Sequence, residues 1–174
     1  MRHNKFHIHQ QSASDHGAVE NLLDAAFGID RRTKTSYRLR EGEQPLPGLS
    51  FIARDADNTI IGAISFWQIH IGDNGPDTAL LGPLAVQPDW QGNGLGQALM
   101  AHGLAAAQKA AHHLVILVGD APYYARAGFK QIPGGQVVMP GPNQPERLLY
   151  LELQSGALAS ATGLIRSPSR YRGR

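Results

Sequence analysis

Residues 81–96 read LGPLAVQPDWQGNGLG, and they decide how the rest of the chain is interpreted. The apolar residues at the start of this stretch predict the end of a β-strand that covers Thr78–Val86. Glycines at positions 92, 94 and 96 follow, and a helix is predicted from about Gly94 to Ala111. Such a turn presents unpaired backbone N–H groups at the positive end of a helix dipole, with no Cβ atoms to hold an anion away. The turn therefore predicts a phosphate-binding site.

Two common phosphate-binding motifs do not fit this turn. The dinucleotide fingerprint needs another glycine spacing and an acid about twenty residues later, which the chain lacks. The Walker A motif needs Gly-Lys-Ser/Thr, where the chain has Leu95-Gly96-Gln97. NAD binding and ATP hydrolysis are therefore disfavoured. No Asp or Glu occurs between Trp90 and Gly119, so a ligand could supply the negative charge that complements the helix dipole. A glycine-rich connection without a ligand stays open as the alternative.

The strand that precedes the turn contains its own irregularity. Gly82-Pro83 lies inside it, and because proline has no N–H to donate, we expect a bulge or a local break in pairing there. The backbone groups of Leu84, Ala85 and Val86 are then free to bind something else. An extended ligand that contains amides, such as pantetheine attached to a pyrophosphate, could lie along them as an added strand.

The apolar run Leu114–Val118 has no polar face and predicts a central strand that is covered on both sides. Because a helix leads into it, it should run parallel to Thr78–Val86 and form a βαβ unit. Hairpin strands precede this unit and a strand-rich segment follows, so we expect an α/β (α+β mixed) fold with a mixed, mostly antiparallel sheet. The other predicted strands are Lys5–Gln10, Leu49–Arg54, Thr59–Ile71, a strand from Phe129 and Leu148–Leu153; the other predicted helices follow a Ser14-Asp15 N-cap up to Phe27, lie within Arg31–Arg40, and begin at Pro122.

Composition sets broad limits on the class of protein. The chain has 174 residues, 42% of them hydrophobic and 17% charged, which excludes a disordered chain and fits one domain. It lacks an apolar run of roughly 18 residues and an apolar segment near its polar N-terminus, so we expect neither a membrane span nor secretion. It has no cysteine, which excludes a disulfide framework, a thiolate nucleophile and a cysteine-ligated metal site. The expected location is the cytoplasm.

The basic residues are unevenly distributed. The predicted domain covers residues 1–154, and the segment Ser155–Arg174 holds four arginines and no acid. We interpret that segment as a basic, partly flexible C-terminal tail with a frayed, solvated end. A second cluster, within Arg31–Arg40, is interpreted as a solvated helix face.

Two sequence motifs resemble a known family. Leu84–Pro88 followed by Gln91–Gly96 resembles motif A of the GNAT superfamily of N-acetyltransferases, and Tyr124–Phe129 resembles the family's Tyr-x-x-x-Gly-Phe motif. The sequence of Gly119–Tyr124 is similar to the corresponding segment in the YhbS-like group of that superfamily. The resemblance covers about Phe6 to Leu153. It implies a GNAT-like fold whose sheet splays after Thr78–Val86 to admit acetyl-CoA, with an amine acceptor entering from the other side.

The resemblance also implies roles for individual residues. Acetyl-CoA is the implied co-substrate, and Tyr124 matches the tyrosine that assists the departing thiolate. The cluster within Arg31–Arg40 would line the acceptor side, where it would suit an acidic acceptor. The implied cofactor-binding residues are Leu84, Ala85, Val86, Gln91, Gly92, Asn93, Gly94, Leu95, Gly96 and Gln97.

The chemistry of acetyl transfer sets two requirements. The amine must be neutral, which costs an alkylammonium roughly 4.6 kcal/mol at pH 7, yet Thr78–Pro83 holds none of the carboxylates that many family members place there. Asp120 is interpreted as a helix N-cap, so the base stays unassigned. The departing thiolate needs a proton or a hydrogen bond. Full proton transfer from an unperturbed tyrosine is uphill by about 2 kcal/mol, so we expect Tyr124 to donate a hydrogen bond that becomes a proton transfer late. The alternative is that Tyr124 is only a packed aromatic ring without a role in the reaction. The neighbouring Tyr123 is expected to point elsewhere on the short helix.

We therefore predict an N-acetyltransferase that moves an acetyl group directly from acetyl-CoA to a primary amine of a small molecule or peptide. The alternatives are a non-catalytic acyl-CoA-binding or regulatory domain and, less favoured, a nucleic-acid-associated module. His7 and His9 share one strand face but lack a third ligand, so no metal site is predicted. We expect neither a membrane nor a nucleic-acid partner, and the sequence leaves a homodimer open.

Overall fold

The computed structural model describes residues 5–171 of the chain. The strands join in one sheet with the order β1-β2-β3-β4-β5-β8-β6, to which β9 adds by pairing with β3 and β7. The pairs β4–β5 and β7–β9 are parallel and the others are antiparallel. The predicted mixed, mostly antiparallel sheet with a central βαβ unit is confirmed. The strands are β1 (His7–Gln10), β2 (Ser50–Arg54), β3 (Ile60–Ile71), β4 (Thr78–Val86), β5 (Leu114–Val118), β6 (Lys130–Gln131), β7 (Val137–Val138), β8 (Leu148–Glu152) and β9 (Gly163–Arg166).

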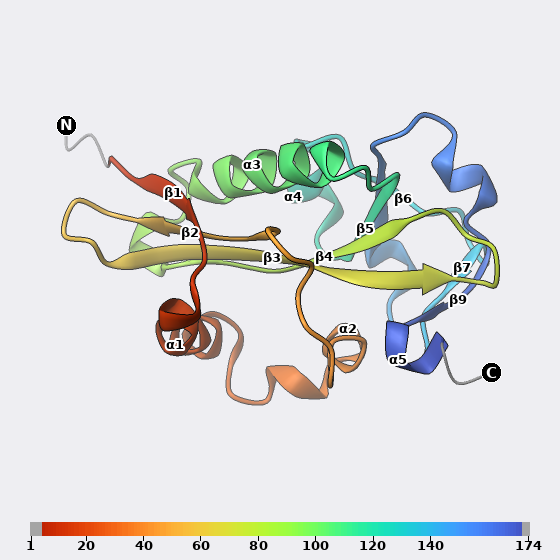
Figure 1. The fold of residues 1–174 in the computed structure, drawn as a ribbon, viewed down its shortest axis with the longest axis horizontal. Coiled ribbons are helices and arrows are strands. Elements are labelled where there is room, and N and C mark those ends of the chain that lie inside the picture. Colours follow the sequence, from red (N-terminus) through yellow and green to blue (C-terminus); the bar gives the residue numbers. More distant parts are fainter. Residues whose placement is uncertain (1–4, 172–174) are drawn as a thin grey trace.

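Helices cover both faces of the sheet (Figure 1). The helix α3 packs on β2, β3 and β4 from one face, and α1 packs on β3 and β4 from the other. Leu99 and Met100 of α3 and Val19 and Leu23 of α1 are buried between the layers, as the helical spacing of their apolar residues predicts. The helices are α1 (His16–Phe27), α2 (Thr35–Arg38), α3 (Leu95–Lys109), α4 (Ala121–Ala125) and α5 (Pro168–Tyr171), with 3-10 turns at Ala13–Asp15, Arg31–Thr33, Pro88–Trp90, Pro145–Arg147 and Ala157–Ser160.

The strand β4 changes its pairing on both sides near Pro83. Toward β3, the register shifts between Ile64 and Phe66, so that the predicted bulge is present. The peptide bond between Gly82 and Pro83 is cis. Toward β5, pairing covers only Thr78–Leu80 against Leu114–Ile116, and the rest of β4 has no partner on that side. The sheet is therefore open between β4 and β5 from Leu81 onward.

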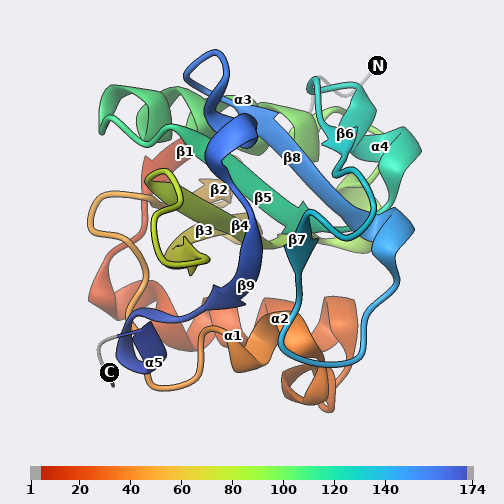
Figure 2. The ribbon, with the colours of Figure 1, turned by 90° about the vertical axis from the view of Figure 1, so that its right-hand side faces the viewer.

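The C-terminal segment is where the structure differs most from expectation. Residues 157–171 do not form a frayed tail but pack against the sheet as a turn, β9 and α5 (Figure 2). Ala161 and Ile165 are fully buried, and β9 pairs with β3 through Ile165 opposite Ile71. Arg166 pairs with Asp73 at 3.1 Å. The few apolar residues of this segment therefore decide its structure, while Arg172 and Arg174 lie outside the described residues.

Among the described residues, none of the helices combines the length and the apolar character needed to cross a lipid bilayer.

Two neighbouring residues of β9 offer a matched test of this packing. Ile165 is fully buried and Leu164 is 38% exposed. We expect Ile165→Ala to lower the free energy of unfolding by about 3 kcal/mol, because it leaves a cavity, and Leu164→Ala to lower it by about 1 kcal/mol or less. Urea denaturation of both variants measures the difference. Equal effects of the two substitutions would show that β9 is not part of the folded core.

Candidate functional site

The turn between β4 and α3 has the backbone geometry that an anion requires. Gly92 and Gly94 have φ values of 75° and 79°, a region that side chains disfavour, and a Cβ at either position would meet no other atom. Gly94 is the N-cap of α3, with no side-chain cap and no acid in the first turn. The N–H groups of Leu95, Gly96 and Gln97 have no partner within the helix, as at every helix start. The positive end of α3 is thus open to a ligand.

The open edge of β4 lies directly before this turn. The N–H of Gln87 donates to the C=O of Ile61 at 2.9 Å, which places Gln87 and Ala85 in the hydrogen-bonded ladder with β3. Because antiparallel pairs alternate, the backbone groups of Leu84 and Val86 face the opposite edge, where β4 no longer pairs with β5. Gln91 Nε2 donates to the C=O of Val86 at 3.3 Å. The remaining groups can hydrogen-bond an extended ligand as a strand would.

Tyr124 lies on α4, which follows β5. Its ring contacts the rings of Tyr123 and Phe129, with centroids 5.0 and 5.9 Å away. It fits because residue 119 is glycine, since a Cβ there would collide with the ring. Burial raises the pKa of Tyr124 to about 12. The phenol is therefore protonated at neutral pH, and complete transfer of its proton to a simple thiolate is uphill by roughly 5 kcal/mol, which favours a hydrogen-bond donor.

Tyr123 does not point away from the site as the sequence predicts. Its hydroxyl packs against Gly96, where a Cβ would collide with it, and its C=O accepts a hydrogen bond from Gln97 Nε2 at 3.3 Å. Burial raises the pKa of this hydroxyl as well. The sequence analysis explains Gly96 by the space that an anion needs. The structure shows that Tyr123 also needs a glycine at this position, although no local sequence pattern indicates that Tyr123 lies beside the turn.

Asp120 is at the N-cap position of α4, as predicted, but its side chain makes no capping hydrogen bond and is exposed. The structural role that the sequence assigns to this carboxylate is therefore not realised.

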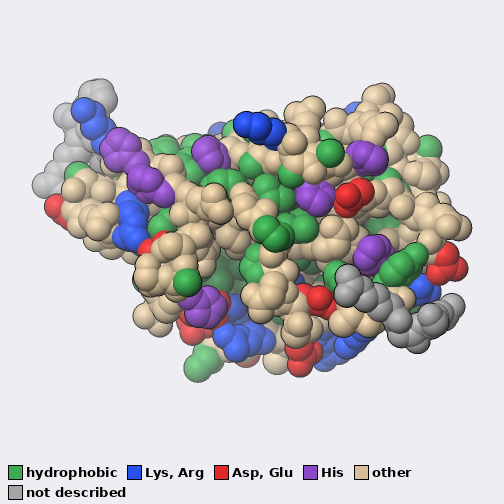
Figure 3. All heavy atoms as spheres, in the orientation of Figure 1, with side chains coloured by type: hydrophobic (Ala, Val, Ile, Leu, Met, Phe, Trp, Pro, Cys, Tyr) green, Lys and Arg blue, Asp and Glu red, His purple; other side chains and the backbone are tan. Residues whose placement is uncertain are grey.

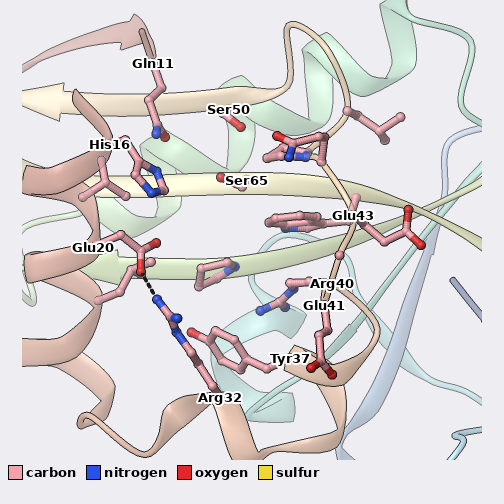
Figure 4. Close-up of a pocket in the computed structure, with 18 of the residues that line it drawn as sticks. Gln11, His16, Glu20, Arg32, Tyr37, Arg40, Glu41, Glu43, Ser50 and Ser65 are labelled. Atoms are coloured by element: carbon pink, nitrogen blue, oxygen red, sulfur yellow. Dashed lines mark hydrogen bonds and ion pairs between the residues drawn. The ribbon is translucent and has the colours of Figure 1, made fainter. Parts of the chain in front are cut away.

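A second feature is a large pocket on the α1 and α2 face of the sheet, with a volume of about 1150 Å³ (Figure 4). Its floor includes Ser50, Ser65 and Trp67, and it reaches β4 at Pro83, which lies within the open edge. The indole N–H of Trp67 donates to the C=O of Gly82 at 2.7 Å and so supports the bulge. The pocket and the open edge therefore meet at one point of β4 from opposite sides.

The arginines of residues 31–40 are not all on a solvated helix face. Arg31 is 2% exposed and pairs with Glu20 and Asp24 at 2.5 and 2.8 Å, and the exposed Arg32 also pairs with Glu20. Burial raises the pKa of Glu20, but the hydrogen bonds from Arg31 and Arg32 outweigh it and hold that pKa below its usual value. Glu20 is therefore an ionised partner of arginines, which makes it a poor base for the acceptor amine.

The two strand histidines lie near each other, with ring centroids 6.4 Å apart. In the part of the chain that the structure describes, no group of three His, Cys, Asp or Glu side chains is placed to hold a metal ion.

The sequence model of the acetyltransferase (GNAT) family matches residues 17–129 of this chain. The uncharacterized N-acetyltransferase YjhQ of Escherichia coli strain K12 is 31% identical over 95% of this chain and 93% of its own. The crystal structure of E. coli YhbS in complex with CoA superposes with a TM-score of 0.82 at 24% identity, covering 100% of this chain and 95% of that one. A GNAT family acetyltransferase from Brucella melitensis in complex with acetyl-CoA gives a TM-score of 0.63 at 27% identity, over 86% and 97% of the two chains.

The raised pKa of Tyr124 predicts how the phenol titrates. We expect ultraviolet absorbance of the native protein to show one tyrosine that ionises near pH 12, because burial disfavours its phenolate. This step should be missing in Tyr124→Phe and present in Tyr150→Phe. Since the native state holds this proton more tightly than the unfolded chain, the associated stability is complete below pH 10 and is lost as pH rises toward 12. Ionisation of Tyr124 near pH 10 would contradict its placement.

Proposed function

This chain belongs to the acetyltransferase (GNAT) family, and from that premise we propose how its residues bind the acetyl donor and assist the transfer. The chain is an N-acetyltransferase that passes an acetyl group from acetyl-CoA to an amine. The observation that carries the assignment of its site is the open edge of β4 next to the unpaired N–H groups at the start of α3.

The donor would lie along this edge. The pantetheine amides pair with the backbone of Leu84 and Val86 at the open edge, on either side of Ala85, whose own backbone groups bond β3. The diphosphate accepts hydrogen bonds from the turn. The turn residues in this role are Gln91, Gly92, Asn93, Gly94, Leu95, Gly96 and Gln97. CoA in the YhbS crystal structure and acetyl-CoA in the B. melitensis structure support a donor of this kind.

The acceptor would enter through the pocket on the α1 and α2 face, because this pocket reaches β4 at Pro83. The amine nitrogen attacks the thioester carbon, the C–S bond breaks, and the thiolate accepts a hydrogen bond from the Tyr124 hydroxyl. The proton of the amine leaves through the water of the pocket. Holding the two reactants at one point of β4 is itself a large contribution to the rate.

We place this activity in the cytoplasm, since the reaction draws on acetyl-CoA and the chain has no cysteine to oxidise. On the face shown in Figure 3, Lys and Arg side chains are interleaved with Asp and Glu and do not form one basic patch, which does not favour a nucleic-acid partner. Gel filtration with light scattering tests the homodimer that the sequence leaves open.

Two glycines with the same geometry test the donor site. Gly94 and Gly135 both have a φ of 79° and open space where a Cβ would lie. Alanine at either position therefore costs about 1 kcal/mol of stability through backbone strain. We expect only Gly94→Ala to weaken acetyl-CoA binding, by about tenfold, because only this Cβ would enter the anion site. Calorimetric titration measures both affinities, and equal affinities would contradict the assignment.

The role of Tyr124 is tested by turnover. We expect Tyr124→Phe to lower kcat for acetylation by about 100-fold through loss of the hydrogen bond to the thiolate, with acetyl-CoA affinity unchanged. Release of the CoA thiol measures the rate. Tyr150→Phe, on β8, is the matched control and should keep the wild-type rate. A Tyr124→Phe enzyme of normal kcat would leave Tyr124 as a packing residue.

A further inference from the structure

The pocket on the α1 and α2 face contains buried polar atoms that form no hydrogen bond with any described residue. Among the described residues, the buried side-chain atoms without a hydrogen-bond partner are Gln11 Oε1, Tyr37 Oη, and Arg40 Nε and Nη1. All of them belong to residues that line this pocket. Buried polar groups are normally hydrogen-bonded, because leaving one unpaired costs free energy. Their gathering in one pocket therefore indicates a polar ligand.

Arg40 is the charged member of this group. Its guanidinium stacks on the rings of Tyr37 and Trp67, 4.6 and 5.9 Å from their centroids, but aromatic faces do not satisfy its N–H donors. The groups that favour its charged form are the hydroxyls of Tyr37 and Tyr124, and neither is a carboxylate. Burial lowers the pKa of Arg40 to about 10, which leaves it a cation at neutral pH. Arg40 as a whole is partly exposed, but its Nε and Nη1 are buried, and no carboxylate of the described residues forms an ion pair with it.

Arg31 lines the same pocket, and in contrast to Arg40 it has carboxylate partners within the chain. Glu20 and Asp24 both bind its guanidinium. Arg40 has two acids close in sequence, Glu41 and Glu43, but Figure 4 shows their side chains pointing away from it while Arg40 and Tyr37 point into the pocket. Within residues 5–171, no carboxylate is therefore the counter-ion of Arg40.

The position of Arg40 limits where a bound anion would lie. Its Nη2 is against the backbone of Gly82, since a Cβ there would be only 2.8 Å away. Gly82 directly precedes the bulge where the pocket meets the open edge of β4. An anion on Arg40 is thus beside the place at which the amine and the thioester would meet, so it must be joined to the amine by only a few bonds.

We propose that the acetyl acceptor is an amine that also carries a carboxylate, as an amino acid does, and that Arg40 and Tyr37 bind this carboxylate. This inference rests on the proposed function, because it assumes that the pocket takes the acceptor. A carboxylate brings one negative charge, which matches the single guanidinium of Arg40, whereas a phosphate monoester brings up to two. The other Lys, Arg, Asp and Glu residues that line the pocket are Arg31, Arg32 and Arg38 and the acids Glu20, Glu41 and Glu43. The guanidinium donors match carboxylate geometry, and the amide of Gln11 is left for the rest of the acceptor.

Binding of products tests the proposal without turnover. The probes are the N-acetyl derivatives of glycine, leucine, phenylalanine, glutamine and lysine, each as the free acid and as the carboxamide, titrated calorimetrically into CoA-loaded protein. We expect at least one acid to bind tenfold or more tightly than its amide. Arg40→Gln should remove this preference and Tyr37→Phe should reduce it. Lys34→Gln, which removes an exposed charge outside the pocket lining, should retain it. Equal binding of acids and amides, no binding of any acid, or a preference that survives in Arg40→Gln would overturn the proposal.

Turnover gives the second readout. With acetyl-CoA and the corresponding free amino acids, amides and decarboxylated amines, we expect kcat/KM to favour an amino acid by roughly 100-fold, and Arg40→Gln to lose this factor. Phosphoethanolamine and taurine test other anions, and a preference for either over the amino acids would overturn the choice of carboxylate. Acetyl-CoA affinity should be unchanged in Arg40→Gln, which shows that the variant is folded. Amine acetylation without a preference for acids contradicts this inference alone, whereas failure of acetyl-CoA to bind wild-type protein contradicts the proposed function.

Discussion

The architecture depends on a change of hydrogen-bond partners in β4 at Gly82–Pro83. Over Thr78–Leu80 β4 pairs with both β3 and β5, whereas Leu81 and the residues after the bulge pair with β3 alone. Proline offers no N–H to a ladder, so pairing cannot pass through it unchanged. The indole of Trp67 binds the C=O of Gly82 and supports the irregular backbone. The sheet therefore opens at a defined residue, and it opens toward backbone groups that are still rigidly held by β3.

This opening explains why the two halves of the site can be built by different parts of the chain. The proposed donor half consists of main-chain groups of β4 and of the start of α3, so it depends on backbone geometry and on glycines more than on particular side chains. The proposed acceptor half consists mainly of side chains from α1, α2 and the segment that follows them. Both meet at Pro83. The shared fold can therefore keep one donor while the α1 and α2 segment changes the acceptor.

The glycine turn before α3 and most of the fold could be predicted from the sequence because their signals are local. The apolar run of β5, the hairpin of β2 and β3, and the glycines of the turn each lie within a few residues. The strand β9 could not be predicted, because it has only four residues and the arginines around it suggest a solvated end. Its burial depends on Ile165 and on pairing with β3, which is far away in sequence. The position of Tyr123 was missed for the same reason, since only the folded chain places its hydroxyl against Gly96.

The difference between Arg31 and Arg40 shows the limit of local patterns most clearly. Both belong to one basic cluster in the sequence, and nothing in the neighbouring residues separates them. The fold brings Glu20 and Asp24 of α1 to Arg31 and brings aromatic rings to Arg40. An unpaired buried charge lowers stability, and an apolar residue of similar size would avoid that cost. Proteins keep such costs where a ligand offsets them. The unmatched guanidinium is thus informative because the same fold supplies carboxylates to its neighbour.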